Sequence, residues 1–168
     1  MPDASTQLLS CLPRLRRYAR ALMGSKMEAD DLVQDTVERG WSRLASWRRG
    51  SDMRVWLFSI MHNLHVDQLR QPSVSTEILD DDTPLPQVSA SETNRPEIRD
   101  MESALQQLSA EQREVVLLVA LEEMTYDEVA SSLGIPMGTV MSRLSRGREK
   151  LRVLMEGGAL ASPLKVIK

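Results

Sequence analysis

The segment Thr125–Arg152 constrains the fold of this chain more than any other part of the sequence. Thr125 and Glu128 have the spacing of a capping box, which predicts that a short helix starts there. Residues 134–136, Gly-Ile-Pro, break that helix, because glycine favours a turn and proline cannot continue a helix. Apolar residues then recur at helical spacing from Met137 to about Leu154, which predicts a second helix. Two helices joined by a tight turn are the arrangement of a helix-turn-helix.

The outward face of the second helix carries mostly basic and hydroxyl side chains. Residues 137–152 include five basic residues and one acidic residue, a net charge of +4. A helix fits the major groove of DNA, where Arg bonds guanine bidentately and Ser or Thr bonds several bases. A solvated amphipathic helix also has a basic face, but here a capped helix and a turn precede it. The pattern therefore predicts duplex DNA binding, through Thr139, Ser142, Arg143, Ser145, Arg146, Arg148 and Lys150.

The rest of the chain is also predicted to be helical. Aromatic residues make up only 4% of the sequence, and residues that favour helices, such as Leu, Met, Ala, Glu and Arg, are plentiful. Helices are expected over 8–23, 25–46, 51–70 and 96–107, and another is expected to start at 109. Trp41 and Leu69 are expected to face inward. The predicted fold class is therefore all-α.

The stretch 71–96 has the composition of a linker. Four prolines interrupt any periodicity there, and Asp80, Asp81 and Asp82 repel one another. Residues 71–100 carry 2 basic and 7 acidic side chains, a net charge of −5. A structureless stretch of this length is too long for an ordinary connection inside a compact domain. We therefore expect two small helical domains, 1–70 and 97–156, joined by an acidic flexible linker and followed by a tail over 157–168.

The second domain resembles a known family. Met124-Thr-Tyr-Asp-Glu-Val-Ala and Leu133-Gly-Ile-Pro-Met-Gly-Thr-Val-Met-Ser-Arg-Leu-Ser-Arg-Gly-Arg are similar to the C-terminal promoter-reading domain of extracytoplasmic-function (ECF) sigma factors. The resemblance implies that the second helix of the motif reads the −35 promoter element. Met141 departs from the pattern, because the family often has Lys or Arg there. The −35 sequence, or one of the contacts to it, is then expected to differ.

The first domain resembles the polymerase-binding part of the same family. Ala29-Asp-Asp-Leu-Val-Gln-Asp-Thr-Val is similar to the helix that docks on the clamp coiled coil of the largest polymerase subunit. The spacing of three and four places four polar residues on one helix face, namely Asp31, Gln34, Asp35 and Glu38. The resemblance implies that this face binds polymerase; taken alone, an acidic face also fits simple solvation.

The segment Trp56–Arg70 is similar to the helix that follows the −10 reading loop in this family. The resemblance implies that the preceding loop captures a base flipped from the nontemplate strand. Trp47, Arg48, Arg49 and Ser51 occupy that place, and Asn63 is a further candidate contact to DNA. Two alternatives stay open: Trp47 stacks on a base or belongs to the core, and Asn63 contacts DNA or neighbouring backbone. Arg49-Gly50 and Met53 differ from the family's Gly-Asp and aromatic residue.

These resemblances imply an RNA polymerase sigma factor. A stand-alone helix-turn-helix regulator and a sigma-like decoy that binds an anti-sigma factor are the alternatives. The expected partners are core RNA polymerase, promoter DNA and an anti-sigma factor, with no direct membrane contact. The lone Cys11 and the lack of a stretch of about 20 apolar residues indicate the cytoplasm. No nucleophile motif or phosphate loop is present, so we expect neither enzymatic activity nor a cofactor. His62 and His65 lie three apart, but without further ligands we expect no metal site.

Overall fold

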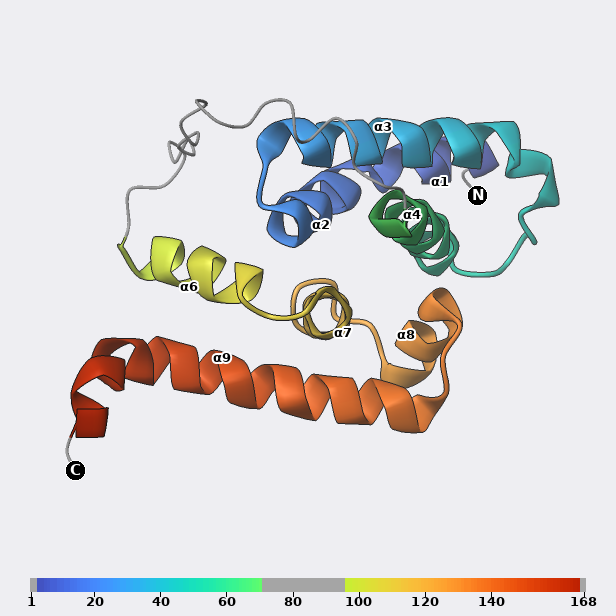
Figure 1. The fold of residues 1–168 in the computed structure, drawn as a ribbon. Coiled ribbons are helices and arrows are strands. Elements are labelled where there is room, and N and C mark those ends of the chain that lie inside the picture. The colour runs from blue at the N-terminus through green and yellow to red at the C-terminus, as the bar shows by residue number, and fades with distance from the viewer. Residues whose placement is uncertain (1–2, 71–95, 167–168) are drawn as a thin grey trace.

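The computed structural model describes residues 3–70 and 96–166, apart from the side chains of 96, 97 and 157–166. Within those ranges every regular element is a helix (Figure 1). The all-α class predicted from the sequence is confirmed. The predicted linker falls almost wholly on residues outside the described ranges.

The first group of helices is α1 (Ala4–Ser10), α2 (Leu12–Met23), α3 (Lys26–Ser42), the short 3₁₀ helix η1 (Leu44–Ser46) and α4 (Met53–Arg70). The single helix predicted over 8–23 is wrong, because the chain breaks at Cys11. Pro13 lies in the first turn of α2, where its missing N–H is tolerated, whereas inside one continuous helix it would clash with the preceding turn. The helix predicted over 25–46 ends at Ser42.

The second group is α6 (Pro96–Gln106), α7 (Ala110–Ala120), α8 (Tyr126–Leu133) and α9 (Met137–Val166). Ser109 caps α7, since its side chain accepts a hydrogen bond from the backbone of Gln112. The end predicted for the last helix, near Leu154, is wrong: α9 continues to Val166, within the predicted tail.

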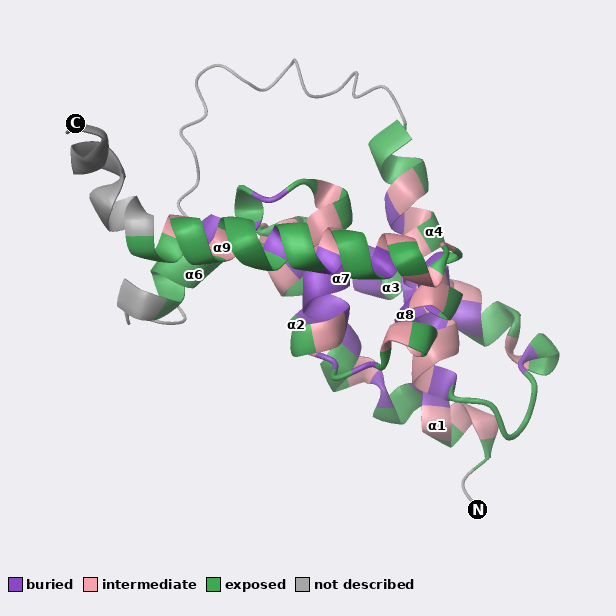
Figure 2. Cartoon of the chain, turned by 90° about the horizontal axis from the view of Figure 1, so that it is seen from below, coloured by how far each residue is buried: buried purple, intermediate pink, exposed green. Residues whose placement is uncertain are grey.

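The two groups of helices pack against each other (Figure 1). Helix α4 lies against α8, and α2 lies against α6 and α7. Buried apolar residues from both groups form one cluster, which includes Leu57 and Phe58 of the first group and Leu118 and Val129 of the second. In this arrangement α9 lies farthest from the first group, and Figure 2 shows exposed residues along its outward side.

Two residues expected in the core lie on the surface. Trp41 is 51% exposed and Leu69 is 60% exposed. Gly40 takes the inward position on α3, because an added Cβ there would lie 2.9 Å from a side-chain carbon of Leu57. The close approach of α3 to α4 therefore uses Gly40, and the next residue, Trp41, is rotated away from the core.

Candidate nucleic-acid interface

Helices α8 and α9 form the predicted helix-turn-helix, and local signals fix its geometry. The capping box at the start of α8 is complete: the Glu128 N–H donates to Thr125 Oγ1 at 3.1 Å, and the Thr125 N–H donates to Glu128 Oε1 at 3.0 Å. Gly134 ends α8 in the left-handed conformation, with φ of 67°, which glycine adopts without steric cost. Val140 and Leu144 are buried and hold α9 in place.

The seven residues predicted to contact the −35 element all lie on the part of α9 that follows this turn. Ser142, Ser145, Arg146, Arg148 and Lys150 are exposed, and Thr139 and Arg143 are half-buried. Arg143 lies 3.9 Å from a carboxylate oxygen of Glu111. Arg146, Arg148 and Lys150 form no ion pair with any described residue. These three side chains are therefore available to bind phosphates or bases.

Arg152 lies on the same helix but is held by two carboxylates. Its guanidinium lies 2.6 Å from Glu149 and 3.1 Å from Glu156. Hydrogen bonding to Arg152 keeps the pKa of Glu149 below its ordinary value. Of the five basic residues counted on this helix, Arg143 and Arg152 therefore already have carboxylate partners.

The residues predicted to contact the −10 element divide into an exposed group and one buried residue. Arg48, Arg49, Ser51 and Asn63 are exposed. Trp47 is only 6% exposed, so the structure places it in the core, where it offers no face for base stacking. The loop is a compact turn in which Ser51 Oγ donates to the Arg48 carbonyl at 2.6 Å and Gly50 has φ of 93°. Asn63 makes no hydrogen bond to any described residue.

The four residues of the predicted polymerase-binding face, Asp31, Gln34, Asp35 and Glu38, are all exposed on α3. Gln34 Nε2 donates to Glu38 Oε2 at 3.4 Å. Two large apolar residues flank this face: Met27 is 74% exposed and Trp41 is 51% exposed. At 100° per residue, Trp41 is rotated by only about 20° from Gln34 around the helix. Trp41 therefore extends the acidic face. Its spacing of seven residues from Gln34 is the feature of the sequence that would have predicted this exposed position.

Family comparisons cover both groups of helices. Residues 98–151 match the family described as Sigma-70, region 4, and residues 8–62 match the Sigma2 domain of PhyR. The ECF RNA polymerase sigma factor EcfG of Rhodopseudomonas palustris is 34% identical over 151 residues, which cover 88% of this chain and 82% of EcfG. The ECF sigma factor SigL of Mycobacterium tuberculosis is 33% identical and is covered to 82%. The chain belongs to the ECF sigma factors. It therefore acts in transcription initiation, as a factor that binds RNA polymerase and promoter DNA.

Solved structures of sigma factors share the fold of this ECF sigma factor. RpoE from Bartonella quintana, in complex with the anti-sigma factor NepR, has a TM-score of 0.74 and 31% identity over 90% of this chain and 96% of that one. CnrH, in complex with the cytosolic domain of CnrY, has a TM-score of 0.67 and 25% identity. PhyR of B. quintana, an anti-anti-sigma factor, is 20% identical and shows the fold alone. Among the described helices of this sigma factor, none is long and apolar enough to cross a membrane.

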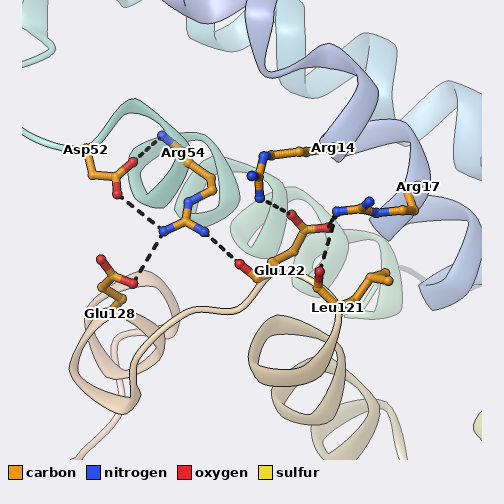
Figure 3. A network of polar contacts seen from close by, with 7 residues as sticks. All are labelled: Arg14, Arg17, Asp52, Arg54, Leu121, Glu122 and Glu128. Atoms are coloured by element: carbon orange, nitrogen blue, oxygen red, sulfur yellow. Dashed lines mark hydrogen bonds and ion pairs between the residues drawn. The ribbon is translucent and has the colours of Figure 1, made fainter.

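A polar network joins the two groups of helices in this sigma factor (Figure 3). Glu122, between α7 and α8, is fully buried, and its two carboxylate oxygens lie 3.2 Å from Arg14 and 3.3 Å from Arg17 of α2. Arg54 of α4 donates to the Glu122 carbonyl at 2.6 Å and also lies 3.4 Å from Glu128. We call the packing that this network holds the closed arrangement.

His62 and His65 also lie where the first group of helices packs against the second. His62 Nδ1 lies 2.8 Å from a carboxylate oxygen of the buried Glu114, and His65 Nδ1 lies 3.6 Å from the same oxygen. Burial lowers the pKa of His65, and this effect outweighs the attraction of Glu114. The spacing of His62 and His65 therefore brings both rings from α4 to one carboxylate of α7.

Proposed function

We propose that this sigma factor docks on the clamp of the largest polymerase subunit through the exposed face of α3, and that it acts in the cytoplasm without catalytic chemistry of its own. The docking site is supported by the exposure of Trp41 and Met27, which lie at either end of the acidic face formed by Asp31, Gln34, Asp35 and Glu38. Tryptophan is enriched among the residues that dominate protein interfaces, so the exposure of Trp41 beside the acidic residues of α3 supports docking through this face.

The promoter contacts follow from the same proposal. The loop with Arg48, Arg49 and Ser51 takes the −10 strand, and the outward face of α9 takes the −35 duplex. The exposure of these side chains supports this assignment. Asn63 adds a polar group on α4, beyond the loop. Trp47 is left out of the assignment because it is buried.

A further partner in this proposal is an anti-sigma factor. Two solved sigma factors with 31% and 25% identity to this chain are complexes with NepR and with CnrY. In this chain, the acidic face of α3 borders a groove of about 530 Å³. The apolar residues Leu12, Val33 and Val37 are among those that line the groove. A regulator that fills this groove covers Gln34 and Glu38, which line it, and so competes with polymerase for the same residues.

Run-off transcription with core polymerase, over a library of candidate promoters, tests the docking site. Asp31→Arg/Asp35→Arg should abolish sigma-dependent transcripts. Asp100→Arg/Glu102→Arg is the matched control: it reverses two exposed charges on α6 and should retain the transcripts. Equal loss in both variants, or full activity in both, would contradict docking through α3.

A pair of substitutions on α9, a test variant and its control, tests the proposed −35 contacts. Arg146→Ala removes an unpaired arginine from α9, and Arg152→Ala removes one that is already held by two carboxylates. We expect Arg146→Ala to lower transcription at least about fivefold, since an arginine contact to a base contributes about 1–3 kcal/mol. Arg152→Ala should stay within about twofold of the parent. A decoy would instead keep its regulator binding while neither substitution changed promoter output.

A further inference from the structure

Four arginines of α2 have no role in the polymerase and promoter contacts assigned so far, and the structure divides them into two pairs. Arg14 and Arg17 face the second group of helices and converge on the Glu122 carboxylate (Figure 3). Arg16 and Arg20 lie along the groove between α2 and α3, on a different side of the same helix. The first pair is the one that holds an anion in the closed arrangement.

Arg14 and Arg17 are only half covered, although their partner is fully buried. Their side chains are 45% and 52% exposed, whereas the Glu122 side chain is 0% exposed. Guanidinium groups bind carboxylate and phosphate oxygens with the same planar geometry. A site that holds the two oxygens of a carboxylate between two arginines therefore suits a phosphate equally well.

The anion site continues into the proposed −10 loop. Arg54 lies beside the pair and also contacts Asp52, the last residue before α4, at 3.4 Å (Figure 3). If the two groups separated, Glu122 and Glu128, the acidic partners of these arginines from the second group, would leave this face. Among the described residues, Arg14, Arg17 and Arg54 would then have only Asp52 as an ion-pair partner, a local charge of +2. Such a field attracts a polyanion to the loop.

We propose that Arg14, Arg17 and Arg54 form a binding site for backbone phosphates of the promoter strand, and that Glu122 occupies this site in the closed arrangement. The proposal deepens the assignment of the −10 loop and rests on it. Glu122 is then an intramolecular competitor of DNA. The promoter strand and the second group of helices cannot hold the two α2 arginines at the same time.

The test measures binding of the full-length chain to a fluorescent single-stranded oligothymidylate of about 20 nucleotides by anisotropy, as a function of salt. Glu122→Gln removes the competing charge and should tighten binding. Glu123→Gln is the matched control, since it removes the same charge from an exposed neighbour and should bind like the parent. The assay contains no polymerase and no promoter sequence. A failure of clamp docking or of base reading therefore leaves its result unchanged.

The arginines are tested in the Glu122→Gln background. Arg14→Gln/Arg17→Gln should lower the slope of log affinity against log salt by about 1.4, as expected for two lost phosphate contacts to a single strand. Arg16→Gln/Arg20→Gln changes the net charge by the same amount and should leave the slope nearly unchanged. If thermal melts show that Glu122→Gln is partly unfolded, Glu122→Asp, which retracts the carboxylate, takes its place. Equal effects of the two arginine pairs, or Glu122→Gln binding no tighter than Glu123→Gln, would overturn the proposal.

Discussion

Replacing Gly147 with alanine should destabilise this sigma factor, although alanine is the better helix former. Gly147 lies in α9 between two of the candidate DNA-binding arginines and faces α7. An added Cβ would lie 2.7 Å from Val116 Cγ2 and 3.4 Å from the Gln112 Cβ. Two carbon atoms attract best at about 3.5–4.0 Å, so the first contact is a clash of almost 1 Å.

The size of the effect follows from two opposing terms. Alanine gains about 1 kcal/mol over glycine inside a helix. Overpacking a core contact costs about 1–3 kcal/mol, and this clash falls toward the upper end because Val116 is β-branched and only 5% exposed. We therefore expect a net loss of about 1–2 kcal/mol in the free energy of unfolding, measured by urea denaturation and circular dichroism.

Gly138→Ala is the internal control. Gly138 lies on the same helix, and no heavy atom lies within 4 Å of its added Cβ. It should stabilise the protein by about 0.5–1 kcal/mol, so the two glycines of one helix should differ in sign. Val116→Ala should relieve part of the Gly147→Ala penalty in the double variant. Equal stabilisation by both alanines would refute the argument that α9 approaches α7 closely at Gly147.

Three further predictions concern stability and reactivity. Thr125→Ala removes the hydroxyl that caps α8 and should cost about 1 kcal/mol in urea denaturation; no change in the midpoint would contradict the capping role. Because burial lowers the pKa of His65 in the folded state, the unfolded chain binds more protons below about pH 6.5, and stability should fall as the pH drops. His65→Gln should make the loss of stability at low pH smaller, and an unaltered pH profile would contradict a role for His65. The titratable and charged groups nearby are His62, Glu114, Arg113 and Tyr18, so their variants serve as controls. Burial also raises the pKa of the Cys11 thiol, so native protein should react slowly with a thiol reagent; a rate equal to that of unfolded chain would show that Cys11 is accessible.

Local chemical signals in the sequence predicted where most helices start and where α2 and α8 end. The Thr125–Glu128 spacing predicted a complete capping box, and Gly24 and Gly134 end their helices in the left-handed conformation. These signals act within four residues, so they need no knowledge of the tertiary structure. The break at Cys11 was missed although its signal, Pro13, was equally local.

The burial of individual side chains was harder to predict where the sequence spacing fits both the inner and the outer face of a helix. Trp41 belongs to the outer face of α3, but its spacing of four from Val37 also fits the inner face. The close approach at Gly40 decides between them, and it depends on Leu57 of another helix. Leu69 lies in the last turn of α4, where no described helix covers it.

The contacts between the two groups of helices were beyond reach of the sequence. Periodicity indicated that α2 has a basic face, but Glu122 lies 108 residues from Arg14. Nothing in local spacing connects them. On α9, by contrast, five of the seven residues predicted to face outward are exposed, because the inward stripe is defined by Val140 and Leu144 within the same helix.

Arg54 takes part in the caps of two helices that belong to different groups. Asp52, whose side chain accepts the Arg54 N–H at the start of α4, and Glu128, which completes the capping box of α8, lie 3.4 Å from the same guanidinium nitrogen. The two carboxylates therefore share one donor, and any event that draws the nitrogen toward one weakens its contact with the other. Coupling between two sites is reciprocal. The free energy by which ordering of the loop before α4 changes the stability of the start of α8 therefore equals the free energy by which α8 changes the stability of the ordered loop. In the closed arrangement, Arg54 thus couples the loop before α4 to the start of α8, and this coupling is lost when Arg54 releases Glu128.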